Sequence, residues 1–122
     1  MASSAGQPTQ ALRWLVRVPD HNTAESSQKR MSLQGEHKAR LTEFKQQNPG
    51  TIQYGGPTLD EETQKPNGSF FVMRHGQGGF ATSSDIRAWI EKDAYWKNGV
   101  WAGVLEIQLY QANTRPKAEN DF

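Results

Sequence analysis

The spacing of apolar residues changes several times along this chain, and the order of these changes limits the folds that it can adopt. Residues 12–18 alternate between apolar and other side chains, which predicts a strand. Residues 23–47 contain no proline and many helix formers, so a helix is expected there, with Gly35 as its least favourable residue. The segment Asn48-Pro49-Gly50 ends this helix.

The same reasoning applies to the second half of the chain. It predicts a short strand over residues 51–54, a buried strand over 70–74, a helix over 85–97 and a long strand over 101–110. Thr82, followed three residues later by Asp85, resembles a capping arrangement at the start of the second helix. Residues 58–68 are polar and contain Pro66-Asn67-Gly68, which is typical of a turn.

The resulting order, β-α-β-β-α-β, is that of an α+β ferredoxin-like fold. This fold has one four-stranded antiparallel sheet with two helices on one face, and it leaves the other face open. If the open face holds Trp14, Phe71 and similar side chains, it needs a partner. We therefore expect two chains to pack face to face as a homodimer that closes into an α/β barrel.

Length and composition indicate one domain with polar tails. The chain has 122 residues, with a disordered tail expected over residues 1–10, the α+β domain over 11–112 and a polar C-terminal tail over 113–122. The absence of cysteine excludes disulfides, thiolate metal sites and a cysteine nucleophile. The three histidines lack the spacing of a metal site, so no metal is expected.

Charge and hydropathy indicate which partners to expect. The net charge of +1 leaves no basic footprint for nucleic acid. No apolar run is long enough to span a membrane, and residues 1–10 lack the apolar core of a signal peptide. We therefore expect a cytoplasmic protein that binds neither nucleic acid nor membrane.

Each predicted helix has polar residues on its otherwise apolar face. The stripe of the first helix consists of Arg30, Leu33, His37, Leu41 and Phe44. The corresponding face of the second helix consists of Ile86, Trp89, Ile90 and Asp93. Because both helices cover the same face of the sheet, His37 and Asp93 can meet.

A contact between His37 and Asp93 would suit proton transfer near neutral pH, because the carboxylate orients the imidazole and makes it more basic. Two structural interpretations stay open. His37 can be a core histidine whose hydrogen bonds are satisfied, and Asp93 can accept backbone N–H groups of the next loop.

The same residues are part of a family resemblance. Residues 29–41 resemble the first-helix signature of the YCII-related (YciI-like) family, in which Arg30 is followed by His37 and then by Leu41. Gly56-Pro57 is similar to the family's Gly-Pro step. Asp93-Ala94-Tyr95 is similar to its Asp-Pro-Tyr segment, with Ala94 in place of proline. The resemblance extends over residues 12–110.

The resemblance implies a fold of the dimeric α/β-barrel superfamily and a catalytic dyad of His37 and Asp93. Arg30 matches the family's arginine, to bind or neutralise an anionic group, and Tyr95, Gly56 and Pro57 are expected to bind substrate. Family members include a dehydrochlorinase that acts on a chlorinated hydroquinone, and similar barrels include lactone isomerases and polyketide cyclases. The implied function is that of a lyase or isomerase of secondary metabolism that needs no cofactor. Its substrate would be a small aromatic, lactone or polyketide-like molecule.

Two alternatives stay open. In the first, the chain is a non-catalytic protein that binds a small molecule or assists a pathway enzyme, and His37–Asp93 is a structural pair. In the second, Arg74-His75-Gly76 after a strand resembles the phosphohistidine signature of histidine phosphatases. The second is disfavoured because no histidine follows His75. The sequence assigns no role to Arg74 or His75.

Overall fold

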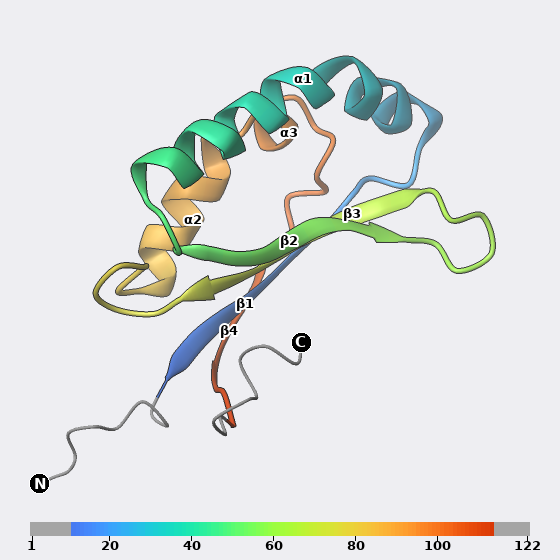
Figure 1. Ribbon diagram of the computed structural model, residues 1–122. Coiled ribbons are helices and arrows are strands. Elements are labelled where there is room, and N and C mark those ends of the chain that lie inside the picture. Colours follow the sequence, from blue (N-terminus) through green and yellow to red (C-terminus); the bar gives the residue numbers. More distant parts are fainter. Residues whose placement is uncertain (1–10, 114–122) are drawn as a thin grey trace, which may run out of the picture.

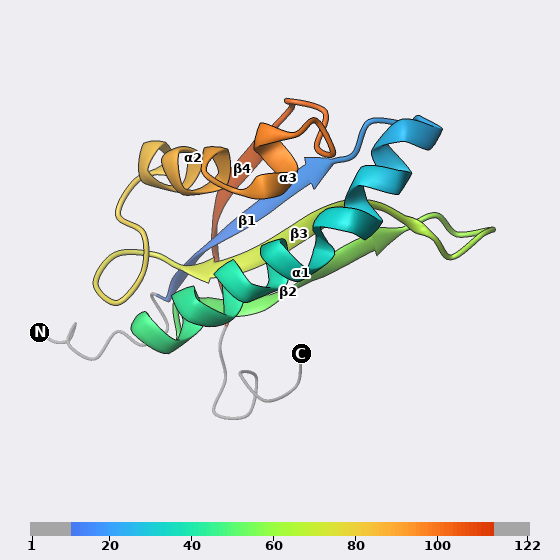
Figure 2. The same cartoon turned by 90° about the horizontal axis from the view of Figure 1, so that it is seen from above.

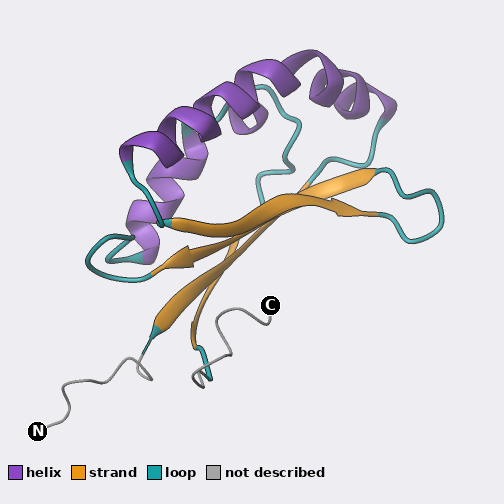
Figure 3. Ribbon diagram, viewed as in Figure 1, coloured by secondary structure: helices purple, strands orange, loops and turns teal. Residues whose placement is uncertain are grey.

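The computed structural model describes residues 11–113, so the expected tails lie outside the described residues except for Asn113. The elements are β1 (Leu12–Pro19), α1 (Ala24–Gln47), β2 (Ile52–Leu59), β3 (Pro66–Arg74), α2 (Ser83–Glu91), α3 (Ala94–Lys97) and β4 (Glu106–Gln111). The strands form one antiparallel sheet in the order β2-β3-β1-β4. The predicted ferredoxin-like fold is confirmed (Figures 1 and 3).

All three helices lie over the same face of the sheet (Figure 2). The core between the layers is formed by apolar side chains of β1, β3, α2 and the segment that follows α3, and it includes Trp14, Val16, Val18, Phe71, Met73, Ile86, Ile90 and Trp101. Within residues 11–113, no helix combines the length and apolar character needed to cross a membrane.

The open face of the sheet differs from the expectation. Trp14 and Phe71 are buried beneath the helices, with 7% and 3% of their surfaces exposed, and the Phe71 ring contacts Trp89 of α2. Side chains alternate along β1, so the open face instead presents Leu15, which pairs with Val72 on one side. A face-to-face partner would therefore meet Leu15 rather than the tryptophan.

The predicted helix over residues 85–97 is in fact two helices. Residue Lys92 caps the C-terminus of α2, and Asp93 caps the N-terminus of α3 with extended backbone angles. The Asp93 carboxylate accepts a hydrogen bond from the Tyr95 backbone N–H, which is the usual role of an N-cap aspartate. This break in the helix sets the direction of the Asp93 side chain.

The hairpin of β2 and β3 is longer than predicted. Gly55, Gly56 and Pro57 lie within β2, and Pro66-Asn67-Gly68 begins β3 instead of forming a turn. The turn lies between them, where the Asp60 carboxylate accepts hydrogen bonds from the backbone N–H groups of Thr63 and Glu62. The bonds from Thr63 and Glu62 lower the pKa of Asp60 below its usual value. β4 is shorter than predicted, because Trp101 forms only an isolated bridge with Asp20.

Two glycines should respond in opposite ways to substitution by alanine. A Cβ at Gly68 would lie 2.9 Å from the Val18 carbonyl oxygen, whereas a Cβ at Gly35 would meet nothing within 4 Å. We expect Gly68→Ala to lower the free energy of unfolding by about 1–3 kcal/mol through overpacking. Gly35→Ala should raise it by about 0.5–1 kcal/mol, because alanine favours a helix interior. Urea denaturation measures both, and a stabilised Gly68→Ala would contradict the packing described for β3.

Candidate active site

His37 and Asp93 lie in direct contact between α1 and the junction of α2 and α3. The Nδ1 atom of His37 is 2.9 Å from one carboxylate oxygen of Asp93 and 3.0 Å from the other. His37 is 8% exposed and Asp93 is 1% exposed, so water screens this contact little. The structure thus brings together the two residues that the helix patterns placed on facing sides.

The buried carboxylate of Asp93 accepts hydrogen bonds from two further groups. The Tyr95 backbone N–H donates to Oδ1 at 2.9 Å, and Nη1 of Arg40 donates to Oδ2 at 3.0 Å. A buried carboxylate is stable only when charge and hydrogen bonds compensate it. Asp93 therefore has the hydrogen-bond partners that its burial requires.

Arg40 is a site residue that the sequence reasoning missed. Its guanidinium donates to Asp93 and to the backbone carbonyl of Trp89, and it lies 4.8 Å from the centre of the Trp89 ring. A signal was present in the sequence, because Arg40 lies three residues after His37 and therefore on the same side of the helix. An arginine on an inward-facing stripe requires an anion nearby.

The imidazole of His37 is held by two aromatic rings. Tyr95 stacks on it with ring centres 4.0 Å apart and an angle of 12° between planes, and Trp101 packs edge-on at 5.7 Å. Because the carboxylate of Asp93 only accepts hydrogen bonds, Nδ1 of His37 must donate. A neutral His37 therefore has its lone pair on Nε2, which is the atom available to accept a proton from another molecule.

Burial raises the pKa of the Tyr95 phenol above its ordinary value, so the side chain is uncharged at neutral pH. Its hydroxyl donates to the backbone carbonyl of Arg30 at 3.2 Å. The Arg30 guanidinium lies 4.8 Å from the centre of the Tyr95 ring. The Tyr95 ring thus contacts both the Arg30 guanidinium and the stacked His37 imidazole.

Arg30 lies on the expected stripe of α1, but its charge is already balanced. The guanidinium binds both carboxylate oxygens of Asp20, at 2.8 and 2.9 Å. It also donates to the Gly68 carbonyl and to the Ser69 hydroxyl. Because Asp20 opposes its charge, Arg30 has less capacity to neutralise a second anion than a free arginine has.

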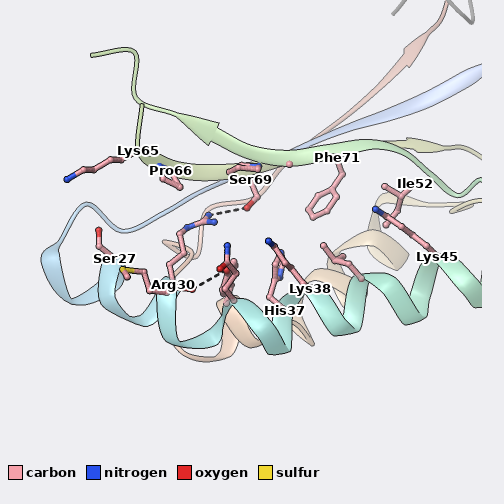
Figure 4. A pocket seen from close by; sticks show the side chains of 17 residues that line it. Ser27, Arg30, His37, Lys38, Lys45, Ile52, Lys65, Pro66, Ser69 and Phe71 are labelled. Carbon is pink, nitrogen blue, oxygen red and sulfur yellow. Dashed lines mark hydrogen bonds between the residues drawn. The ribbon is translucent and has the colours of Figure 1, made fainter. Parts of the chain in front are cut away.

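A cavity of about 550 Å³ opens between α1 and the hairpin of β2 and β3 (Figure 4). Five of the six predicted site residues line it, and they are Arg30, His37, Gly56, Pro57 and Tyr95. The sixth, Asp93, does not line the cavity and contacts His37 directly. The volume is in the range of sites that hold small organic ligands.

The other histidines and Arg74 lie apart from this cavity. His75 follows β3 and its ring is 5.4 Å from that of Trp14, and neither it nor Arg74 lines the cavity. Exposed His21 lies in the turn after β1. Among the described residues, no group of three or more His, Asp or Glu side chains is placed to hold a metal ion.

Comparison with known proteins supports the fold. No protein-family model and no curated protein sequence matches the chain. Among solved structures, it is similar to 5-chloro-2-hydroxyhydroquinone dehydrochlorinase from Burkholderia phenoliruptrix AC1100, in complex with 2,5-dihydroxybenzoquinone. The identity is 26%, the TM-score is 0.63, and the match covers 79% of this chain and 90% of the other. The chain thus shares its fold with a lyase whose structure holds a small quinone.

Two further structures are more distant. A monooxygenase from Streptomyces coelicolor in complex with nanaomycin D is 11% identical, with a TM-score of 0.47, and the match covers 93% of this chain and 96% of the other. A dimeric ferredoxin-like protein from Jannaschia sp. CCS1 is 13% identical, with a TM-score of 0.42 and coverage of 83% and 99%. At these identities and TM-scores, the two structures do not indicate a function for this chain.

Neutralising Asp93 should destabilise the fold. In Asp93→Asn the cation of Arg40 loses its carboxylate, and a neutral amide replaces an acceptor of three hydrogen bonds. We expect the free energy of unfolding to fall by about 3 kcal/mol, as when one partner of a buried ion pair is removed. Urea denaturation measures the change, with exposed Glu61→Gln as the control. Equal stability of the two variants would mean that Asp93 does not organise this junction.

The raised pKa of Tyr95 should appear in the dependence of stability on pH. Because the folded pKa lies above the unfolded value, this contribution is complete at pH below the unfolded pKa of about 10 and is lost as the pH rises through the folded pKa. The free energy of unfolding should therefore decrease more in wild type than in Tyr95→Phe above about pH 10. Chemical denaturation of both proteins between neutral and alkaline pH tests this. Parallel curves would contradict the burial of the phenol.

Proposed function

We propose that this protein is a cofactor-independent lyase or isomerase of the YCII-related family, with His37 as its general base and general acid. The observation that supports this most directly is the position of His37. Its Nδ1 is bound to buried Asp93, and the same residue lines a cavity of about 550 Å³. An imidazole fixed in this way has one nitrogen for the carboxylate and one for a ligand.

The proposed reaction is a proton transfer. Nε2 of His37 takes a proton from a phenolic O–H, or from a C–H beside a carbonyl, and the electron pair stays on the substrate as a phenolate or enolate. In a lyase that acts on the keto form of the substrate, the enolate pair then forms a C=C bond to the neighbouring saturated carbon as the bond from that carbon to a leaving group such as chloride breaks, and the imidazolium keeps the proton. In an isomerase, the imidazolium returns the proton to a different atom. Asp93 stabilises the imidazolium in both cases.

The dehydrochlorinase supports a small aromatic substrate. That enzyme is named for 5-chloro-2-hydroxyhydroquinone, and its structure holds 2,5-dihydroxybenzoquinone. The cavity of this chain has apolar walls from Met31, Leu41, Ile52 and Phe71, which suit a flat ring of similar size. Lactones and polyketide-like molecules fit the same proposed chemistry, because they too have acidic hydrogens beside a carbonyl.

The alternative function is binding without turnover, as a small-molecule carrier or an accessory protein. One observation favours it, because the hydrogen bonds of Asp93 to His37, Arg40 and Tyr95 form a complete network that would stabilise the fold without any reaction.

We further propose that the protein is cytoplasmic and works as a homodimer joined through the open face around Leu15.

The test is to replace His37 by asparagine and to measure turnover on chlorinated and unchlorinated hydroxyhydroquinones and on small lactones. Loss of the base should reduce kcat by at least about 100-fold, as general base catalysis contributes about that much. His75→Asn is the matched control, since this histidine lies outside the cavity, and it should keep full activity.

Size-exclusion chromatography and circular dichroism accompany the kinetics. Both variants are expected to stay folded and to elute as dimers. A folded His37→Asn variant that keeps its activity would contradict the catalytic role of His37. Absence of turnover in wild type, together with loss of stability in His37→Asn, would favour the accessory function instead.

A further inference from the structure

We propose that the cavity selects an anion, namely a small aromatic ring with an ionised carboxylate or phenolate, and that Lys38 and Lys45 determine this selectivity. The inference rests on the proposed function, since it names the class of molecule that the same cavity would take. It follows from the charges that line the cavity and from the pairs in which those charges are, or are not, already compensated.

Among residues 11–113, the lining of the cavity includes basic side chains and no acidic one. Of the described residues that line it, four are cationic, namely Arg30, Lys38, Lys45 and Lys65, and none is aspartate or glutamate. Two acidic groups bind residues of the site and are already paired, because Asp20 binds Arg30 and Asp93 binds His37 and Arg40. The positive charge of the lysines is therefore not cancelled by an acid of the cavity.

The lysines form no ion pair with another described residue. The ion pairs of residues 11–113 join other side chains: Arg17–Glu106, Lys29–Glu25, Arg30–Asp20, His37–Asp93, Arg40–Asp93 and Arg87–Glu91. Exposed lysines are usually solvated, and one lysine at the edge of a cavity would indicate little. Here several lysines border one concave, largely apolar cavity. Because apolar walls screen charge less than water does, the positive electrostatic potential of the lysines adds up inside it.

The arrangement of the lysines explains why two of them matter most. Lys38 and Lys45 are seven residues apart, so they lie two turns apart on the same side of α1. In Figure 4, Lys38 points toward the sheet beside His37, and Lys45 points toward Ile52, whereas Lys65 points away from the centre of the cavity. An anionic group between Lys38 and Lys45 would place the attached ring near Phe71 and His37.

The same charges would assist the proposed reaction. Removing a proton from the substrate leaves a phenolate or enolate, and fixed cations beside it stabilise that charge as it develops. Arg30 is less suited to this role because the carboxylate of Asp20 already accepts hydrogen bonds from its Nε and Nη2. The lysines thus supply the positive charge that the sequence reasoning had assigned to Arg30.

The experiment compares two ligands that differ only in charge, 2,5-dihydroxybenzoate and 2,5-dihydroxybenzamide, by isothermal titration calorimetry. We expect wild type to bind the benzoate about tenfold more tightly than the benzamide, and this preference should shrink between about 0.02 M and 0.5 M salt. The double variant Lys38→Gln/Lys45→Gln should lose most of the preference, mainly through weaker binding of the benzoate. The control Lys92→Gln/Lys97→Gln removes the same charge from exposed positions outside the cavity and should keep it.

Three results would overturn the inference. They are equal affinity of wild type for the two ligands, an unchanged preference in Lys38→Gln/Lys45→Gln, and no binding of the benzoate up to millimolar concentration. The titrations are repeated in His37→Asn, which removes the proposed base but not the lysines. Selectivity for the anion without turnover in wild type would sustain this inference and reject the proposed function. Turnover on neutral and anionic substrates alike would do the reverse.

Discussion

The buried carboxylate of Asp93 is the interaction on which the arrangement of the helices depends. It accepts hydrogen bonds from α1 through His37 and Arg40, and from the start of α3 through the Tyr95 backbone. A carboxylate that is 1% exposed must have such donors, or its burial would cost more than the fold can supply. The distance between α1 and the other two helices and the orientation of the His37 ring follow from this requirement.

The break between α2 and α3 gives this carboxylate its position. In a continuous helix the Asp93 backbone N–H and carbonyl would form the helical hydrogen bonds to residues four positions away. Its side chain would then point back along the helix, toward the N-terminus. As an N-cap with extended backbone, Asp93 instead turns its side chain back over the first turn of α3 and toward α1. Tyr95 is then placed two residues later, where its ring stacks on His37. One local break therefore orients Asp93 and Tyr95, two of the three groups that contact the imidazole.

Much of the fold and the centre of the site could be predicted from the sequence. Apolar periodicity identified β1, α1 and the order of the elements, and the stripes of the two helices brought His37 and Asp93 to facing sides. These features depend on burial along a whole element, which a regular pattern records. The open face was misjudged because alternation alone does not say which side of β1 the helices cover.

The features that could not be predicted depend on single contacts between distant segments. The strand predicted over residues 51–54 stops before Gly55, yet residues 55–57 extend β2 because β3 supplies pairing partners along their whole length. Asp20 follows a strand and has no pattern of its own, so its ion pair with Arg30 is visible only in three dimensions. Arg40 was overlooked for a different reason, since its place on the inward stripe was readable but an arginine there was not matched to Asp93.

The division of charge in the site explains how one layer of side chains can serve both the fold and a ligand. Arg30 and Arg40 are each bound to a carboxylate, so their charges are compensated by ion pairs that hold the helices and strands together. Nδ1 of His37 belongs to the same hydrogen-bond network, which leaves Nε2 for a ligand in the cavity that His37 lines. The charges free of ion pairs lie outside this buried layer, on the lysines at the edge of the cavity, where water keeps their cost low. A ligand that enters the cavity displaces part of that water. The attraction between the lysines and a charge on the ligand is then screened less than it would be in bulk water. The buried pairs thus hold the elements together, whereas in the proposed function the exposed cations would select the ligand and the imidazole would take part in both.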